Sequence, residues 1–120
     1  MPETVKSGMS LMNRGLRTLK KQIADPTKKD ENLKLIGDVE RGCVIAKNAT
    51  PERQLNAVED KAKRDETAIA YRRQLLKVLS KLVKMETAVM DGKNDEASAT
   101  LDEIVKLRDE GHEMMGVDER

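Results

Sequence analysis

Residues 5–23, VKSGMSLMNRGLRTLKKQI, carry the clearest structural signal in the chain. Apolar side chains recur in this stretch at alternating intervals of four and three residues, and most other positions are charged, polar or glycine. The apolar set is Val5, Met9, Met12, Leu16, Leu19 and Ile23. Because an α-helix has about 3.6 residues per turn, this spacing puts the whole set on one face and predicts an amphipathic helix over residues 2–24.

Three further segments repeat the helical spacing of apolar residues. Helices are predicted over residues 29–49, from a start between residues 56 and 63 to residue 90, and from Asp95, as the capping residue, to about residue 115. The breaks between segments contain proline or glycine, at Asp25-Pro26, Thr50-Pro51 and Asp91-Gly92. A residue before proline disfavours the α region and glycine favours turns, so the helices are expected to end there.

No segment alternates apolar and polar residues with a period of two, so strands are not expected. The chain has 120 residues, which is the size of one ordinary domain. Four helices of similar length with short connections predict an all-α fold, an antiparallel up-down-up-down four-helix bundle formed by residues 1–120 as a single domain. The connection over residues 49–60 is the longest and is expected to contain a short helical turn.

Composition argues against two classes of partner. The 23 lysines and arginines nearly balance 22 aspartates and glutamates, and aromatic residues make up 1% of the chain. Nucleic-acid binding needs a basic face, and single-strand binding needs aromatic stacking. No run of about twenty apolar residues could cross a membrane, and the start, MPETVKSGMS, lacks the apolar stretch of a signal peptide. We therefore expect neither nucleic-acid binding nor membrane insertion.

The chain has one cysteine, Cys43, and one histidine, His112. A single cysteine excludes an internal disulfide and a Cys-rich zinc site. A single histidine excludes the two Glu-x-x-His motifs of di-iron bundles, and no EF-hand loop is present. Cys43 is therefore predicted to be a small core residue, and His112 is the one imidazole available to a cofactor.

The predicted topology brings His112 near a methionine. The first helix of such a bundle begins, and the last helix ends, at the same end, so Met9 and His112 are expected to face each other across the core. A thioether and an imidazole on opposite walls suit heme iron, which takes a Met/His axial pair in electron-transfer cytochromes. Taken singly, Met9 is more simply a core methionine, and His112 is a histidine beside the helix C-terminal dipole.

Two stretches resemble the cytochrome b562 family of soluble four-helix heme proteins. They are residues 9–19, MSLMNRGLRTL, and residues 92–112, which end in RDEGH; Ala49-Thr50-Pro51 also fits. The resemblance implies that Met9 and His112 are the axial ligands of a heme, with Arg108 at the porphyrin edge, toward a propionate. The cofactor-binding residues expected on this basis are Val5, Met9, Met12, Leu16, Pro51, Tyr71, Leu75, Arg108 and His112.

The chain departs from the family pattern in two places. The family usually has phenylalanines in the pocket, where this chain offers Tyr71, Leu75 and Met12. Gly111 stands where the family has an aromatic residue beside the ligand histidine, so one wall is expected to be thinner. Covalent attachment needs Cys-x-x-Cys-His, and the thiol positions here hold Arg108 and Gly111. The expected cofactor is therefore heme b, held without covalent bonds.

Two protein ligands would fill both axial positions of the iron, which favours one-electron transfer over catalysis and predicts a protein that is not an enzyme. Its partner is expected to be a redox protein of unknown identity, and the chain itself a monomer or weak oligomer. The resemblance implies a periplasmic location, with the cytoplasm as the alternative because no signal peptide is visible.

Three other functions are compatible with the sequence. They are a heme carrier or sensor from which Met9 dissociates, a heme-free bundle that binds a partner, and a structural component of a larger assembly. The structural component requires a contiguous apolar stripe on the outside of the protein. The outward positions of the predicted helices are expected to carry no such stripe.

Overall fold

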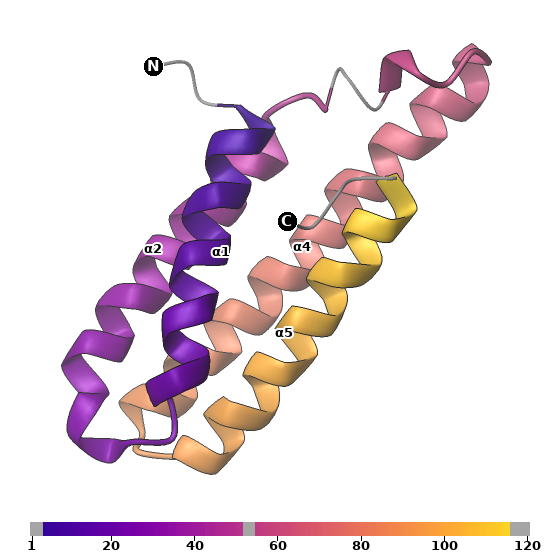
Figure 1. Cartoon of the computed structure of the whole chain (residues 1–120). Coiled ribbons are helices and arrows are strands. Elements are labelled where there is room, and N and C mark those ends of the chain that lie inside the picture. The colour runs from indigo at the N-terminus through magenta and orange to yellow at the C-terminus, as the bar shows by residue number, and fades with distance from the viewer. Residues whose placement is uncertain (1–3, 52–54, 116–120) are drawn as a thin grey trace.

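The computed structural model describes residues 4–51 and 55–115, and it is all-α in these ranges. Its elements are α1 (Val5–Gln22), a 3-10 turn η1 (Pro26–Lys28), α2 (Lys29–Asn48), α4 (Lys61–Met90) and α5 (Asn94–Met115). The helices run alternately down and up, so α1 starts and α5 finishes at the same end (Figure 1). The predicted antiparallel four-helix bundle is confirmed, and no strand occurs in the described ranges.

The helix boundaries follow from local capping. The Ser7 amide donates to Thr4 Oγ1 at 3.1 Å and the Thr4 amide donates to Ser7 Oγ at 2.9 Å, a reciprocal cap that starts α1. Asp60 starts α4 by accepting from the Ala62 amide at 2.9 Å. Glycine supplies the turn before α5, because Gly92 has a φ of 73°.

The start of the last helix corrects one expectation. The helix α5 begins at Asn94, so Asp95 lies inside its first turn and is not the capping residue. The side-chain amide of Asn94 donates from Nδ2 to the Ile23 carbonyl at 3.0 Å, which links the start of α5 to the end of α1. Asp95 still contributes negative charge to the positive end of the helix dipole.

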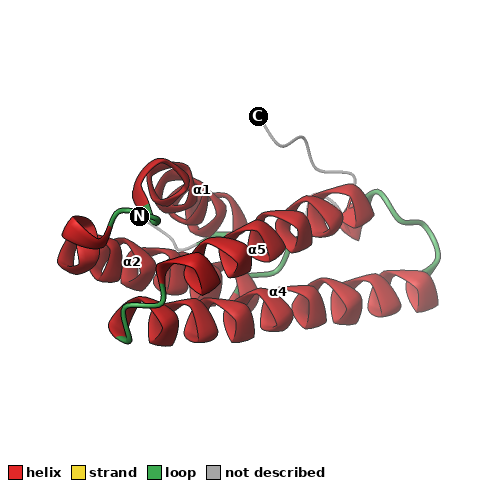
Figure 2. Cartoon of the chain, turned by 90° about the horizontal axis from the view of Figure 1, so that it is seen from below, coloured by secondary structure: helices red, strands yellow, loops and turns green. Residues whose placement is uncertain are grey.

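The buried face of each helix is the one that its periodicity predicts. Figure 2 shows α4 and α5 side by side, with α1 and α2 packed next to them. The large side chains that are almost wholly buried come from all four helices; they include Met12, Leu16, Leu19, Ile36, Val39, Val78, Leu82, Met85, Leu101 and Ile104. Cys43 is fully buried as predicted, and its thiol donates to the Leu75 carbonyl at 3.4 Å. Burial raises the pKa of this thiol to about 11.

Glycines bring the backbones of α1 and α2 into direct contact. A Cβ placed on Gly8 would lie 2.6 Å from the Ala46 nitrogen and 2.7 Å from the Gly42 oxygen. A Cβ placed on Gly42 would lie 2.7 Å from the Gly8 oxygen in return. No side chain fits at either position without a backbone shift, so the two glycines determine how closely α1 approaches α2.

The other side of α1 is much more open. The helices pack chiefly as the pairs α1–α2, α2–α4 and α4–α5, whereas α1 and α5 approach each other at few residues. Figure 1 shows the α1–α2 pair and the α4–α5 pair diverging toward the end where both termini lie. The α1–α5 seam is therefore the loosest side of the bundle.

The outer face of α4 exposes separate apolar side chains with charged and polar residues between them, and not a contiguous apolar stripe. Four large apolar side chains are about half exposed there, namely Ile69, Leu76, Val83 and Met90.

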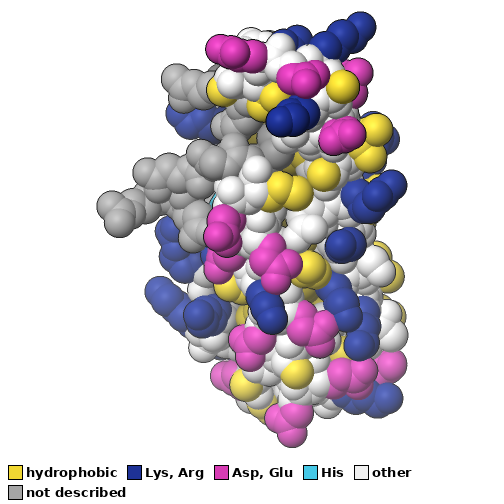
Figure 3. Space-filling view, turned by 90° about the vertical axis from the view of Figure 1, so that its right-hand side faces the viewer, with side chains coloured by type: hydrophobic (Ala, Val, Ile, Leu, Met, Phe, Trp, Pro, Cys, Tyr) yellow, Lys and Arg dark blue, Asp and Glu magenta, His cyan; other side chains and the backbone are white. Residues whose placement is uncertain are grey.

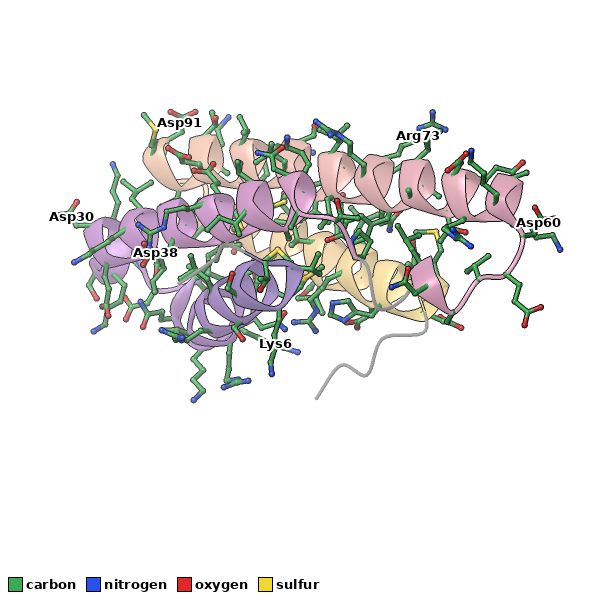
Figure 4. The ribbon with its side chains drawn as sticks, turned by 90° about the horizontal axis from the view of Figure 1, so that it is seen from above. Lys6, Asp30, Asp38, Asp60, Arg73 and Asp91 are labelled. Carbon is green, nitrogen blue, oxygen red and sulfur yellow. The ribbon has the colours of Figure 1, made fainter. Side chains whose placement is uncertain are left out.

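The surface as a whole is strongly charged. The view in Figure 3 shows acidic and basic side chains interspersed with small hydrophobic areas. The labelled charged side chains of Figure 4, from Lys6 to Asp91, likewise lie on the outside of the bundle.

Two carboxyl groups meet between α2 and α4. Glu40 lies within hydrogen-bonding distance of Glu86, and both side chains are partly buried. Burial, together with the hydrogen bond and the charge of Glu86, raises the pKa of Glu40 from 4.5 to about 7. The pair therefore shares a proton in mildly acidic solution and is electrostatically unfavourable in alkaline solution.

The glycine contact predicts opposite effects for two Gly→Ala substitutions. Gly42→Ala should lower the free energy of unfolding by about 1–3 kcal/mol, because the added methyl group forces α1 away from α2. Gly37→Ala is the matched control: a Cβ at this exposed helical position meets nothing within 4 Å, so it should raise stability by about 0.5–1 kcal/mol. Urea unfolding followed by circular dichroism measures both. Equal stability of the two variants would contradict the close contact.

The carboxyl pair predicts a dependence of stability on pH. A carboxyl whose pKa is higher in the folded state stabilises the fold below the unfolded pKa, and this stabilisation is lost as pH rises from about 4.5 to about 7. The unfolding free energy of Glu40→Gln minus that of the unaltered protein should therefore be about 1 kcal/mol larger at pH 8 than at pH 5, allowing for solvent screening. Urea unfolding at both pH values tests this. Glu86→Gln should show only part of the effect, because burial would still raise the pKa of Glu40. If the difference in unfolding free energy between Glu40→Gln and the unaltered protein were the same at both pH values, the shared proton would be contradicted.

Candidate functional site

The two candidate iron ligands lie at the end of the bundle where the chain begins. Met9 is in the second turn of α1, and His112 is in the last turn of α5. The His112 side chain is 4% exposed, whereas Met9 is partly buried and packs against the core. An imidazole this well buried in a helix-end position is directed into the bundle and not toward solvent.

A hydrogen bond across the loose seam sets the register of α1 against α5. Arg108 Nη1 donates to Asn13 Oδ1 at 3.2 Å. Asn13 is one helical turn inward from Met9, and Arg108 is one turn inward from His112. Because α1 and α5 are antiparallel, the next turn outward on each helix brings Met9 and His112 to the same level of the seam. The long arginine side chain bridges a spacing that shorter side chains would not span.

Arg108 makes several contacts within the chain. Its guanidinium donates to Asn13 and also donates from Nε and Nη2 to Asp109 Oδ1, at 3.1 and 2.9 Å. Its expected contact with a propionate at the porphyrin edge stays a prediction. A guanidinium has five N–H donors in a planar fork, so these contacts leave further donors for another acceptor. Sequence reasoning did not single out Asn13, although it lies four residues after Met9 inside the quoted MSLMNRGL stretch.

A buried tyrosine of α4 links this helix to the end of α2. Tyr71 is 5% exposed, and its hydroxyl donates to the Ala46 carbonyl at 2.8 Å, near the end of α2. Burial raises the pKa of this hydroxyl, so it stays a donor at any physiological pH. Pro51 and Leu55 are buried beside the same end of α2, and the Leu55 amide donates to the Pro51 carbonyl at 3.0 Å.

The remaining predicted pocket residues divide into two groups. Val5 is partly buried at the outer end of α1, next to the Met9 turn. Met12, Leu16 and Leu75 are buried deeper and belong to the continuous core. Val5, Met9 and His112 therefore lie toward the end of the bundle where α1 begins and α5 ends, and Met12, Leu16 and Leu75 lie deeper in the core.

The wall beside Gly111 is not as thin as its missing side chain suggested. A Cβ on Gly111 would lie 3.1 Å from Cγ of Gln74, so the glutamine of α4 occupies that space. Gln74 Nε2 also donates to the Leu107 carbonyl at 2.8 Å, which holds the side chain against α5. The aromatic residue of the family is thus replaced by a polar side chain from the neighbouring helix.

The donor set fits an iron porphyrin. The thioether of Met9 and the imidazole of His112 lie near the same end of α1 and α5, the neighbouring helices that pack least closely, and buried apolar residues lie deeper in the core. These are the two donor types of low-spin electron-transfer hemes.

No cluster of three or more His, Cys, Asp or Glu side chains suited to a metal ion occurs within residues 4–51 and 55–115. No helix in the described part of the chain has the length and apolar character to cross a membrane.

Comparison with known proteins agrees with this geometry. A family model for cytochrome b562 matches residues 4–115, nearly the whole chain. Searches of curated proteins and of solved structures gave no match. Cytochromes of this family bind heme, act as electron carriers and are typically periplasmic. Because the match covers nearly the whole chain and the fold is a four-helix bundle, the chain belongs to the cytochrome b562 family.

Proposed function

We propose that this chain is a b-type cytochrome that transfers single electrons through one non-covalently bound heme, with Met9 and His112 as the axial ligands of its iron. The observation that supports the proposal most is the Arg108–Asn13 hydrogen bond, because it joins α1 and α5 one helical turn away from Met9 and from His112. The family's heme binding supports the choice of cofactor.

The bound heme supplies the one-electron chemistry, and the chain's own residues determine what it can do. Met9 and His112 would hold the heme iron from two sides and leave no place on it for a substrate, so we expect a carrier and not an enzyme. The buried side chains of Met12, Leu16 and Leu75 would keep water away from the heme. Only Cys43 could form a thioether, and it is fully buried in mid-helix, which supports non-covalent binding.

Several side chains hold the two ligands in place. The Arg108–Asn13 bond holds α5 against α1, and the Tyr71–Ala46 bond holds α4 against the end of α2. The remaining guanidinium donors of Arg108 are available to a heme propionate at the end of the bundle where α1 begins and α5 ends. Electrons would enter and leave through the heme edge at this end, where a redox partner protein docks. Since the family is typically periplasmic, we place the protein in the periplasm.

Titration with hemin tests the proposed ligands. The unaltered protein should take up one heme and give the sharp spectrum of a six-coordinate low-spin iron in both oxidation states. Met9→Ala and His112→Ala should each weaken heme binding about tenfold or more, since each removes one iron–ligand bond. Met9→Ala should also lower the reduction potential, because the thioether raises it.

Met114→Ala is the matched control, because Met114 is 44% exposed on the same turn of α5 as His112. It should leave the spectrum and the affinity unchanged. Rapid carbon monoxide binding by the reduced, unaltered protein would contradict the Met9 ligand and support a heme carrier or sensor. Absence of any Soret band would contradict heme binding altogether.

A further inference from the structure

The two helices that carry the proposed heme ligands have opposite charges. The helix α1 contains five basic residues and no acidic one, namely Lys6, Arg14, Arg17, Lys20 and Lys21. The helix α5 contains seven acidic residues against two basic ones, Lys106 and Arg108. Opposite charges attract over distances longer than a hydrogen bond, so α1 and α5 are drawn together along their loosely packed seam.

One residue on each helix lines the seam with the charge that the other side lacks. The guanidinium of Arg108 binds both Asn13 of α1 and Asp109, so Asp109 lies on the side of α5 that faces α1. Asp102 precedes Asp109 by seven residues, which is two helical turns, and therefore lies on the same side. On α1, Arg17 follows Asn13 by four residues, about one turn. Arg17 and Asp102 consequently line opposite edges of the seam.

The positions of this arginine and this aspartate along the seam also match. At one end the Asn94 side chain donates to the Ile23 carbonyl, and further along Arg108 donates to Asn13. The arginine lies six positions before Ile23 and four after Asn13. The aspartate lies eight positions after Asn94 and six before Arg108. Because both lie near the middle of the interval between these two hydrogen bonds, the antiparallel helices bring them to about the same level.

Both side chains are available for such a contact. The ion pairs within residues 4–51 and 55–115 involve other side chains, and Arg17 and Asp102 are both exposed. No acidic residue of α1 competes for the guanidinium. Lys106 lies one turn after Asp102 and offers an ammonium group to the same carboxylate. A guanidinium binds a carboxylate through two parallel N–H donors, so Arg17 is the stronger partner.

We propose that Arg17 and Asp102 form an ion pair across the α1–α5 seam and act as positioning residues that hold α1 against α5. The pair adds a third link between the two that the structure already shows. Met9 is on α1 and His112 is on α5, so separating these helices also separates the proposed ligands. The consequence for heme rests on the proposed function: the ion pair slows the release of heme, and salt, which screens the pair, accelerates it.

Hydrogen exchange of the α1 amides in the purified full chain tests the ion pair and does not require heme. Arg17→Glu and Asp102→Arg should each raise the exchange rate about threefold to fivefold, because each replaces an attraction by a repulsion. The double variant Arg17→Glu/Asp102→Arg should restore the rate, and Arg17→Lys should keep it within about twofold. In about 1 M NaCl the differences among these variants should disappear.

Arg73→Glu is the matched control, since it makes the same change of charge at an exposed arginine of α4. Figure 4 shows Arg73 and Lys6 of α1 pointing away from opposite sides of the bundle. This variant should leave the exchange of the α1 amides unchanged, and circular dichroism checks that every variant is folded. An equal rise in exchange with Arg73→Glu, or no restoration by the double variant, would overturn the ion pair.

Transfer of heme from the loaded protein to excess apomyoglobin measures the consequence for the proposed heme site. Arg17→Glu should release heme about threefold to fivefold faster than the unaltered protein, and the double variant should release it at the unaltered rate. If hydrogen exchange shows the ion pair but Arg17→Glu leaves the release rate unchanged, the role of the pair at the heme site is overturned. If the chain takes up no heme, the proposed function fails, and hydrogen exchange still decides whether the ion pair exists.

Discussion

The approach of α1 to α2 through Gly8 and Gly42 is the constraint on which the rest of the bundle depends. Backbone atoms of the two helices lie where side chains would normally separate them. A helix drawn this far to one side cannot pack equally well on the other, so α1 contacts α5 at few residues. The two glycines thus allow close packing between α1 and α2, whereas the packing between α1 and α5 stays loose.

Both candidate ligands belong to the loosely packed α1–α5 seam, since Met9 is on α1 and His112 is on α5. Polar bonds hold it without closing it: Arg108 reaches across to Asn13, and Tyr71 fastens the adjacent pair of helices to Ala46. At the other end of the bundle, Gln22 binds Asn32 at 2.8 Å and Asn94 binds Ile23, which fixes the turns together. A flat cofactor between helices would need one end held together in this way and a loosely packed seam at the other.

Much of this architecture follows from helical periodicity, which correctly placed Met12, Leu16 and Cys43 in the core because burial repeats with the helical turn. Periodicity does not say which residues of two helices meet. The sequence therefore did not reveal the contact of Gly42 with Gly8 or the bond of Arg108 to Asn13. For the same reason it suggested a thin wall at Gly111, where Gln74 of α4 fills the space.

The central claim is that a thioether and an imidazole bind one iron across the α1–α5 seam. Iron K-edge X-ray absorption of the heme-loaded protein tests it most directly, because sulfur and nitrogen scatter differently and lie at different distances from the metal. The account predicts one sulfur scatterer, from Met9, together with nitrogen scatterers from the porphyrin and His112. A first coordination shell of nitrogen or oxygen alone would contradict it.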